Sequence, residues 1–297
     1  MTPLDRARTS LEGLSIGDAF GETFFGDLNQ ILPRIGSRTL PEHVWPYTDD
    51  TEMALSIVEH LAARGEIEQD DLAERFARRM QPSRGYGKGA FAILDGVRRG
   101  KHWRTLARDG FNGMGSFGNG AAMRVAPLGA YFADREVDFI AEQAKLSSEV
   151  THAHAEGIAG GIAVAIAAAL AQRSAGSRAP LGRAFVETVR DHTPAGYTRD
   201  AIAEVLAVSS DADALVAARA LGNGSGVTAP DTVPFCLWVA SRFSHDFVEA
   251  MWNTVTALGD RDTTCAIVGG IVICQTGRGA IPEEWLEYRE PIELETQ

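Results

Sequence analysis

A pair of adjacent aspartates stands where a helical pattern begins. Thr48, Asp49 and Asp50 directly precede apolar residues that recur at three- and four-residue steps. Capping accounts for one of the two carboxylates, because Asp and Thr are favoured at helix N-termini and the helix dipole favours negative charge there. A second aspartate beside the first exceeds what capping needs. The pair therefore marks a candidate functional site.

A second acidic turn lies near the other end of the chain. Asp260 and Asp262 flank one arginine, and Thr263 follows them directly before another apolar helical run. The D-x-D spacing lets both carboxylates converge on one point, and oxygen ligands without Cys or His suit Mg²⁺, Mn²⁺ or Ca²⁺ rather than Zn²⁺. Taken alone, this pattern is weak evidence for a metal.

The two acidic turns could form a single site if they meet in space. One cleft would then hold four carboxylates, those of Asp49, Asp50, Asp260 and Asp262. Unpaired carboxylates at close range either take up protons or raise the cost of folding, whereas two divalent cations balance four such charges. Paired metals can hold and activate a water and can orient an oxygen-rich substrate. The arrangement therefore predicts a hydrolase.

Two further segments are candidates for ligand contact. Residues 113–124 form a glycine-rich turn that opens a helix, and backbone amides there could bind an anion, although the segment lacks the Lys of a P-loop. Taken alone, it is more typical of a tight turn. His152 and His154 are two residues apart and do not share a helical face, so contact with a ligand or capping by Thr151 is favoured over a metal pair. Residues 85–87 and 222–226 are interpreted as loops.

The elements that must position these residues are helices. Apolar residues follow a helical period nearly throughout, alternating strand patterns are scarce, and Gly, Pro, Ser or Asp stands at most joints. The sequence therefore predicts an all-α fold. Besides the helices that follow Asp49 and surround Phe247, the predicted helices span residues 4–20, 69–80, 88–99, 119–132, 135–148, 153–172, 181–191, 198–208, 211–220, 231–243 and 262–275.

Composition narrows the classes of function. The chain has 28 Lys and Arg against 40 Asp and Glu, a net charge of −12, which argues against binding to nucleic acid or anionic membranes. Cys236, Cys265 and Cys274 suggest neither a disulfide framework nor a thiolate metal site, and they fit a reducing compartment. The N-terminus has no secretory pattern, so we expect a cytoplasmic protein. The apolar run 157–171 is too short for a membrane span and predicts a buried helix.

In chain order, the motifs form a recognisable set. They are GDAFG at 17–21, TDDT at 48–51, GSFGNGAAMR at 115–124, THAH at 151–154 and GDRDT at 259–263. This set resembles the ADP-ribosylglycohydrolase family, which includes the dinitrogenase reductase-activating glycohydrolases. The resemblance runs from about residue 8 to residue 280. It implies an orthogonal all-α bundle that forms a single domain over residues 1–297.

The resemblance also implies a site and a reaction. The family hydrolyses the glycosidic bond between ADP-ribose and an acceptor, at the ribose anomeric carbon, with two Mg²⁺ or Mn²⁺ ions. The implied metal ligands are Thr48, Asp49, Asp50, Asp260, Asp262 and Thr263. The implied ADP-ribose contacts are Ser116, Phe117, Gly118, Asn119 and His152. The partners would be ADP-ribosylated proteins or other ADP-ribosylated acceptors, including nucleic acid only when it is itself modified, with ADP-ribose as product and no membrane.

One departure concerns the catalytic acid. Many members of the family carry a Glu four residues after the second glycine of the first motif, where this chain has Phe25. Glu22 is the nearby acid and could replace it from a shifted turn. The candidate catalytic residues are therefore Asp49, Asp50 and Glu22.

Two alternative functions stay open. A metal-dependent phosphohydrolase on a helical scaffold could use the same acidic and glycine-rich groups. Such enzymes commonly use a His-Asp doublet, and the one doublet here, His245 and Asp246, begins a helical pattern where capping explains it. The other alternative is a catalytically silent relative that binds ADP-ribose, because a fold alone does not guarantee activity. The retained aspartates argue against that alternative.

Overall fold

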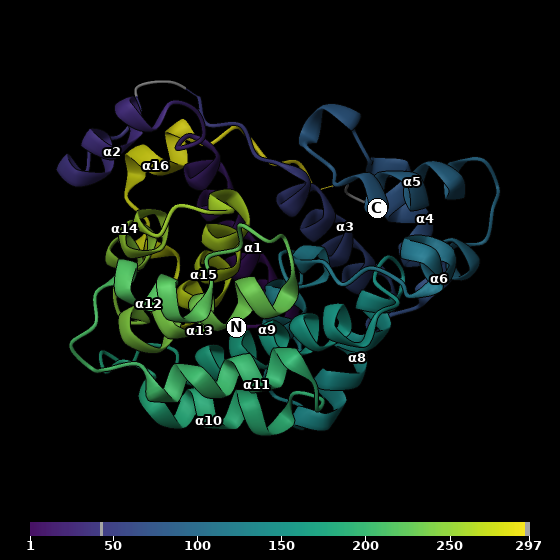
Figure 1. The fold of residues 1–297 in the computed structure, drawn as a ribbon. Coiled ribbons are helices and arrows are strands. Elements are labelled where there is room, and N and C mark those ends of the chain that lie inside the picture. Colours follow the sequence, from purple (N-terminus) through teal and green to yellow (C-terminus); the bar gives the residue numbers. More distant parts are fainter. Residues whose placement is uncertain (42–43, 295–297) are drawn as a thin grey trace.

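The computed structural model describes residues 1–41 and 44–294, in which helices alternate with short turns (Figure 1). Within these residues there is no extended strand, and pairing is limited to isolated bridges. The prediction of an all-α fold is confirmed. The helices are α1 Pro3–Glu22, α2 Leu28–Ser37, α3 Asp49–Arg64, α4 Gln69–Arg79, η1 Pro82–Arg84, α5 Lys88–Arg98, α6 Trp103–Gly113, η2 Asn119–Ala121, α7 Ala126–Tyr131, α8 Val137–Glu149, α9 Ala155–Arg173, α10 Gly182–His192, α11 Tyr197–Glu204, η3 Val205–Ala207, α12 Ala214–Leu221, α13 Ala229–Phe243, α14 Phe247–Thr256, α15 Arg261–Thr276, η4 Arg278–Ala280 and α16 Glu283–Tyr288.

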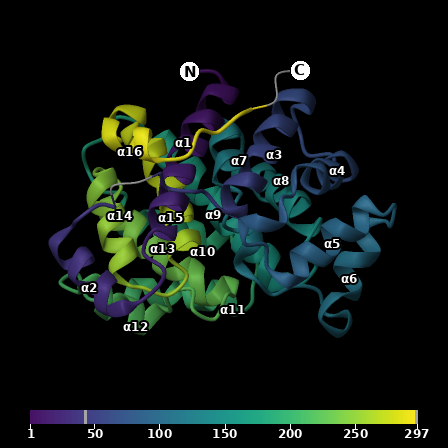
Figure 2. The same cartoon turned by 90° about the horizontal axis from the view of Figure 1, so that it is seen from above.

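Helices α1 and α15 pack backbone to backbone, although they come from opposite ends of the chain (Figure 2). Gly17 and Gly21 lie one turn apart on the contact face of α1. A Cβ atom on Gly17 would stand 2.1 Å from the Cys265 carbonyl oxygen, and one on Gly21 would stand 2.2 Å from that of Arg261. Only glycine permits this approach, which brings the C-terminal part of α1 against the first turn of α15.

Helix α9 passes through the interior of the bundle. Its Ala- and Gly-rich faces are buried nearly all round, as predicted for residues 157–171. In the part of the chain that the structure describes, it is the one helix long and apolar enough to cross a membrane, yet 78% of its apolar stretch is buried within the protein. Packing among neighbouring helices accounts for its apolar character.

Several helix predictions were wrong in detail. The segment 119–132 is not one helix but η2 followed by α7, separated by a turn. Pro127 stands in the first turn of α7, a position that proline favours, and it was the signal for a second helix. Helices α2, α6 and α16 were not predicted. Pro33 inside α2 weakens its helical pattern, although Asp27 caps that helix by accepting from the Asn29 amide at 3.0 Å.

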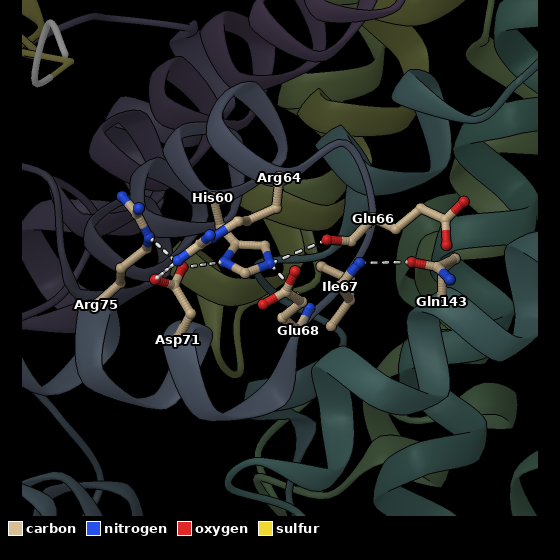
Figure 3. A network of polar contacts seen from close by, with 8 residues as sticks. All are labelled: His60, Arg64, Glu66, Ile67, Glu68, Asp71, Arg75 and Gln143. Atoms are coloured by element: carbon tan, nitrogen blue, oxygen red, sulfur yellow. Dashed lines mark hydrogen bonds and ion pairs between the residues drawn. The ribbon is translucent and has the colours of Figure 1, made fainter.

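A polar network fixes the C-terminal half of α3 against α4 (Figure 3). The buried His60 ring contacts Asp71 Oδ2 through Nδ1 at 2.7 Å, and its Nε2 accepts from the Glu68 amide at 3.0 Å. The Ile67 amide donates to Gln143 Oε1 of α8 at 2.7 Å. These contacts hold α3 in place, and therefore also the acidic residues at its other end.

Candidate active site

A buried aspartate on α1 organises the start of α3. Asp18 is fully buried and accepts from the Thr48 amide at 2.9 Å and from the Thr48 hydroxyl at 2.8 Å. It also accepts from the Thr51 amide at 3.1 Å and from the Thr51 hydroxyl at 2.5 Å. The sequence motif contained Asp18, but no function was predicted for it. An acid in the middle of a buried helix was the available signal, since such a group must find hydrogen-bond partners.

Capping does not explain the aspartates of the two acidic turns. Thr48 is the N-cap of α3, and its hydroxyl accepts from the Asp50 amide at 3.3 Å, so Asp49 and Asp50 are free to point elsewhere. Asp260 stands at the N-cap position of α15 but makes no capping bond with its side chain. Its Oδ2 accepts instead from Asn119 Nδ2 at 2.7 Å.

The two turns line one cleft of about 540 Å³. Its wall includes Asp49 and Asp50 from α3, and Asp260, Asp262 and Thr263 from the start of α15. The close packing of α1 with α15 and the anchoring of α3 on Asp18 produce this meeting. Acidic residues that are more than 200 positions apart in the sequence thus share one space.

The carboxylates of the cleft repel one another in a partly desolvated setting. Burial and the charge of Asp18 raise the pKa of Asp49 to about 7. Burial, Asp18 and Asp262 raise the pKa of Asp50 well above its ordinary value. Burial and the charge of Asp260 do the same for Asp262. A cation or a proton must compensate this cluster.

Two buried oxygens in this cluster, Asp50 Oδ2 and Asp262 Oδ1, have no hydrogen-bond partner. Across residues 1–41 and 44–294, no three His, Cys, Asp or Glu side chains are grouped closely enough to enclose one ion. An Mg²⁺ ion usually keeps several waters and takes only one or two carboxylates from the protein, so a closed protein cage is not needed. The unpartnered oxygens and the all-oxygen donor set therefore fit Mg²⁺ or Mn²⁺.

The glycine-rich segment forms another wall of the cleft. All four predicted contacts in it line the cleft: Ser116, Phe117, Gly118 and Asn119. The segment is fixed by the loop before α13, since the Asn119 amide donates to the Val227 carbonyl at 3.3 Å and the Ala229 amide donates to the Phe117 carbonyl at 3.3 Å. It is therefore more than a tight turn, because it presents backbone and side-chain polar groups to the cleft.

His152 lines the cleft, whereas His154 does not. Burial and the charge of Arg124 lower the pKa of His152 to about 3, so the ring is neutral. Its Nδ1 lies 2.8 Å from the Thr151 hydroxyl. His154 caps α9 by accepting from the Glu156 amide at 3.1 Å. The predicted capping by Thr151 is therefore wrong, because His154 is the N-cap of α9, while ligand contact by His152 stays a prediction.

Two predicted site residues, Thr48 and Glu22, lie outside the cleft lining. The Thr48 hydroxyl donates instead to the buried Asp18. Glu22 is half-buried, and burial together with the charge of Asp18 raises its pKa. Phe25 is 43% exposed, and its ring lies 4.7 Å from the Arg261 guanidinium carbon.

Sequence reasoning missed several residues of the cleft wall. Gly85, Gly87 and residues 226–228, which include parts of the two predicted loops, line the cleft, as do Lys88 and Phe111. Arg124 also lines it and is fully buried. It donates to the Ser147 carbonyl at 3.0 Å, and burial lowers its pKa to about 9. An arginine at the end of a run of small and apolar residues was a visible but unused signal.

Acidic clefts of this kind occur in several classes of hydrolase, and comparison with known proteins separates them. The sequence profile of the ADP-ribosylglycohydrolases matches residues 1–296 of the chain. The chain belongs to the ADP-ribosylglycohydrolase family. Membership of this family argues against the helical phosphohydrolase alternative, and Asp246 of the His-Asp doublet caps α14 by accepting from the Glu249 amide at 3.0 Å.

Relatives within the ADP-ribosylglycohydrolase family match nearly the full chain. The ADP-ribosylhydrolase ARH3 of Homo sapiens is 28% identical over an alignment of 348 positions, which covers 98% of this chain and 90% of that protein. An uncharacterized protein of Archaeoglobus fulgidus is 31% identical over 301 residues, covering 95% of this chain and 91% of its own. A solved structure, described as an ADP-ribosylglycohydrolase-related protein complex, superposes with a TM-score of 0.69 at 25% identity and covers 97% of this chain and 93% of its own.

Proposed function

We propose that this member of the ADP-ribosylglycohydrolase family is a metal-dependent hydrolase that releases ADP-ribose from an ADP-ribosylated acceptor. The bond cleaved would be the glycosidic bond at the ribose anomeric carbon. The observation that carries the proposal is the cluster of mutually repelling carboxylates, with unpartnered oxygens on Asp50 and Asp262, beside a glycine-rich wall. The similarity to ADP-ribosylhydrolase ARH3 over 98% of the chain supports it.

Two Mg²⁺ or Mn²⁺ ions would be held by the oxygens of the two acidic turns. The proposed ligands in the cleft wall are Asp49, Asp50, Asp260, Asp262 and Thr263. Thr48, which was also predicted as a ligand, would instead position Asp50, because its hydroxyl donates to Asp18 and accepts from the Asp50 amide. When bound there, such ions supply Lewis-acid stabilisation of substrate oxygens and lower the pKa of a coordinated water. Asn119 contributes by holding Asp260 at 2.7 Å, which fixes the orientation of that carboxylate.

The glycine-rich wall would bind the ADP-ribose. The backbone of Ser116 to Asn119 is held against the loop before α13, so its polar groups are in place before a ligand arrives. His152 is neutral and its Nδ1 is engaged by Thr151, which leaves Nε2 as the nitrogen available to a ligand. A neutral ring contacts a ribose hydroxyl without bringing a second positive charge beside Arg124.

Proton transfer would fall to carboxylates. Burial and the charge of Asp18 raise the pKa of Asp49 to about 7 in the ion-free cleft, whereas bound cations would oppose that shift and keep the carboxylate ionised, so Asp49 would act as a proton acceptor. Glu22 is the candidate for a second acid, because burial and Asp18 raise its pKa. As bond cleavage develops positive charge at the anomeric carbon, nearby carboxylates would stabilise an oxocarbenium-like state.

The experiment is an acceptor panel. Purified protein with Mg²⁺ or Mn²⁺ is offered ADP-ribosylated arginine, serine, cysteine and nucleic acid, and O-acetyl-ADP-ribose, and free ADP-ribose is measured. We expect release from at least one substrate by the parent protein and by Asp71→Asn, which changes a carboxylate far from the cleft, but not by Asp50→Asn. Equal release by the parent and Asp50→Asn would contradict the proposal.

The position of Phe25 favours one competing function, a silent protein that binds ADP-ribose. Phe25 supplies no proton, and Glu22 lies outside the cleft lining. A ligand that binds only the folded state must raise the melting temperature. Stabilisation by ADP-ribose together with no release from any member of the panel would establish the silent function instead of the proposed one.

A further inference from the structure

One wall of the cleft is a loop that should be poorly ordered on its own. The glycine loop, residues 85–89, contains Gly85, Gly87 and Gly89, and all three line the cleft. Gly85 is left-handed with φ of 90°, and a Cβ atom there would lie 3.8 Å from Asp49 Oδ1. Glycine-rich segments lose much conformational entropy when they adopt one conformation, so contacts from elsewhere must hold this loop.

The first such contact comes from α3. Glu52 is buried, and its Oε2 accepts from the Gln81 amide at 2.8 Å and from the Tyr86 hydroxyl at 2.7 Å. These two donors stand on either side of η1. Because Glu52 lies one helical turn after Asp49, the anchor of the glycine loop and the acidic site share one rigid helix.

The second contact comes from the C-terminal part of the chain. Arg84, directly before the glycine loop, donates to Glu290 through Nη1 at 2.8 Å and through Nη2 at 2.5 Å. Its Nη1 also donates to the Tyr47 carbonyl at 2.9 Å, and its guanidinium carbon lies 3.8 Å from the centre of the Tyr47 ring. The side chains of Arg84 and Glu290 are only 14% and 26% exposed, which makes a bidentate pair stronger than a surface ion pair.

The C-terminal strap, residues 288–290, is itself firmly attached. The Trp45 amide donates to the Tyr288 carbonyl at 2.6 Å, and the Glu290 amide donates to the Trp45 carbonyl at 2.9 Å. Arg289 Nη2 donates to Glu12 Oε1 of α1 at 3.1 Å. The strap therefore joins α1, the segment that leads into α3, and the start of the glycine loop.

We infer that Glu52 and the C-terminal strap together brace the glycine loop as a preformed wall of the cleft, which makes Arg84 and Glu290 positioning residues for ligand binding. Neither residue lines the cleft. They keep the loop in its binding-competent conformation, so losing the pair lowers the competent fraction and weakens apparent affinity by the same factor. The identity of the ligand, ADP-ribose, rests on the proposed function.

The test combines loop exchange with ligand binding. Arg84→Ala, Glu290→Ala and the double variant are compared with the parent, and Arg99→Ala is the matched control because its pair with Asp95 at 2.8 Å lies on α5 away from the cleft lining. Hydrogen exchange of residues 81–90 is measured without ligand. The Kd of ADP-ribose and the kinetic constants are measured with Mg²⁺.

We expect faster exchange of residues 81–90, a Kd and KM about tenfold higher, and kcat within about twofold of the parent in both single variants. The double variant should resemble Arg84→Ala, since that substitution already removes both the pair with Glu290 and the contacts with Tyr47. Glu290→Gln, which keeps the shape of the side chain, and Tyr86→Phe, which removes only the bond to Glu52, give the same readouts if an alanine variant fails to fold. Both should show smaller shifts in the same direction.

Three results would overturn the inference. Unchanged exchange in the variants would show that no brace exists, whatever the ligand. Faster exchange with unchanged Kd would show that the brace does not serve binding. If the parent itself did not bind ADP-ribose, the proposed function and the positioning role would both fall, whereas an intact parent with unaffected variants would remove this inference alone.

Discussion

The carboxylates near the two ends of helix α3 have opposite electrostatic surroundings. At the C-terminal end, Asp71 accepts from Arg75 Nε at 2.7 Å, from Arg64 Nη2 at 3.0 Å and contacts His60 Nδ1 at 2.7 Å (Figure 3). Burial opposes its ionisation, but these three donors hold its pKa well below the ordinary value. At the N-terminal end, Asp49 and Asp50 face further carboxylates, and their pKa values rise.

The contrast separates a structural charge cluster from a functional one. The Asp71 network contains its own counterions, so the protein alone completes it. The cleft holds oxygens of Asp50 and Asp262 with no partner, so it is completed only by something that enters from outside. Substitution in the Asp71 network should therefore lower the stability and leave the activity intact. Substitution in the cleft should lower the activity without lowering the ion-free stability.

The largest expected effect is on turnover. Asp262→Asn should lower kcat/KM about a thousandfold, because metal-assisted charge stabilisation contributes several kcal/mol and each factor of ten corresponds to about 1.4 kcal/mol. The readout is release of ADP-ribose from the best substrate of the panel. Asp71→Asn should stay within about twofold of the parent, since Asp71 is remote from the cleft lining. Similar losses of kcat/KM in Asp262→Asn and Asp71→Asn would contradict the division into a functional and a structural carboxylate cluster.

The next effect is stabilisation by ions. Adding Mg²⁺ or Mn²⁺ at about one hundred times its Kd should stabilise the parent by about 2.7 kcal/mol for each bound ion, because the ions bind only the folded state. Denaturant unfolding with and without the ion measures this gain. Asp71→Asn should keep the gain and Asp50→Asn should lose most of it. An equal gain in Asp50→Asn would place the ions elsewhere.

The third effect concerns stability without ions. Asp71→Asn should lower the free energy of unfolding by about 2 kcal/mol, because charge-assisted hydrogen bonds lose one partner. Asp50→Asn should instead raise it by about 1 kcal/mol in the presence of a chelator, because it removes an unpartnered buried charge. Opposite signs are the essential result. Destabilisation by both substitutions would mean that the cleft is already compensated within the protein.

The last effect is the pH dependence of stability. Asp49 has a folded-state pKa of about 7 against 3.8 as its ordinary value, so the folded protein keeps a proton that the unfolded chain has lost. This contribution is fully present below pH 3.8 and is lost as pH rises through about 7. In chelator, the free energy of unfolding should therefore fall between these limits, by at most about 1.4 kcal/mol per pH unit for each proton.

Asp71 contributes with the opposite sign. Its pKa is lowered on folding, so its contribution is present above the ordinary value and is lost as pH falls below it. Unfolding curves for the parent, Asp49→Asn and Asp71→Asn over the same pH series test both signs. Asp49→Asn should flatten the decline above pH 3.8, and a decline of unchanged slope would assign the proton to another group.

The sequence was most informative where a local pattern decides the chemistry. The pairing of Asp49 with Asp50, the D-x-D turn and the glycine-rich segment were visible as motifs, and helical periodicity indicated the fold class. Their convergence depended on α1 and α15, whose contact requires Gly17 and Gly21 at one-turn spacing. That spacing was present in the sequence, but a pattern of small residues does not say which helix it contacts.

The residues that sequence patterns did not reveal owe their positions to tertiary contacts. Glu52 looks like one more acid in a helical first turn, yet it anchors the loop through Gln81 and Tyr86. Arg84 and Glu290 are 206 residues apart, so no local pattern links them. Arg124 lines the cleft because η2 ends and a turn follows, which the prediction of one continuous helix over 119–132 concealed.

The central claim is that the two acidic turns together hold divalent cations. Anomalous diffraction from crystals of the protein grown with Mn²⁺ tests it most directly. We predict two manganese peaks in the cleft, bounded by Asp49 and Asp50 on one side and by Asp260 and Asp262 on the other, and their loss in Asp50→Asn crystals. Crystals that bind manganese only at other positions, or that show the cleft without any peak, would contradict the claim.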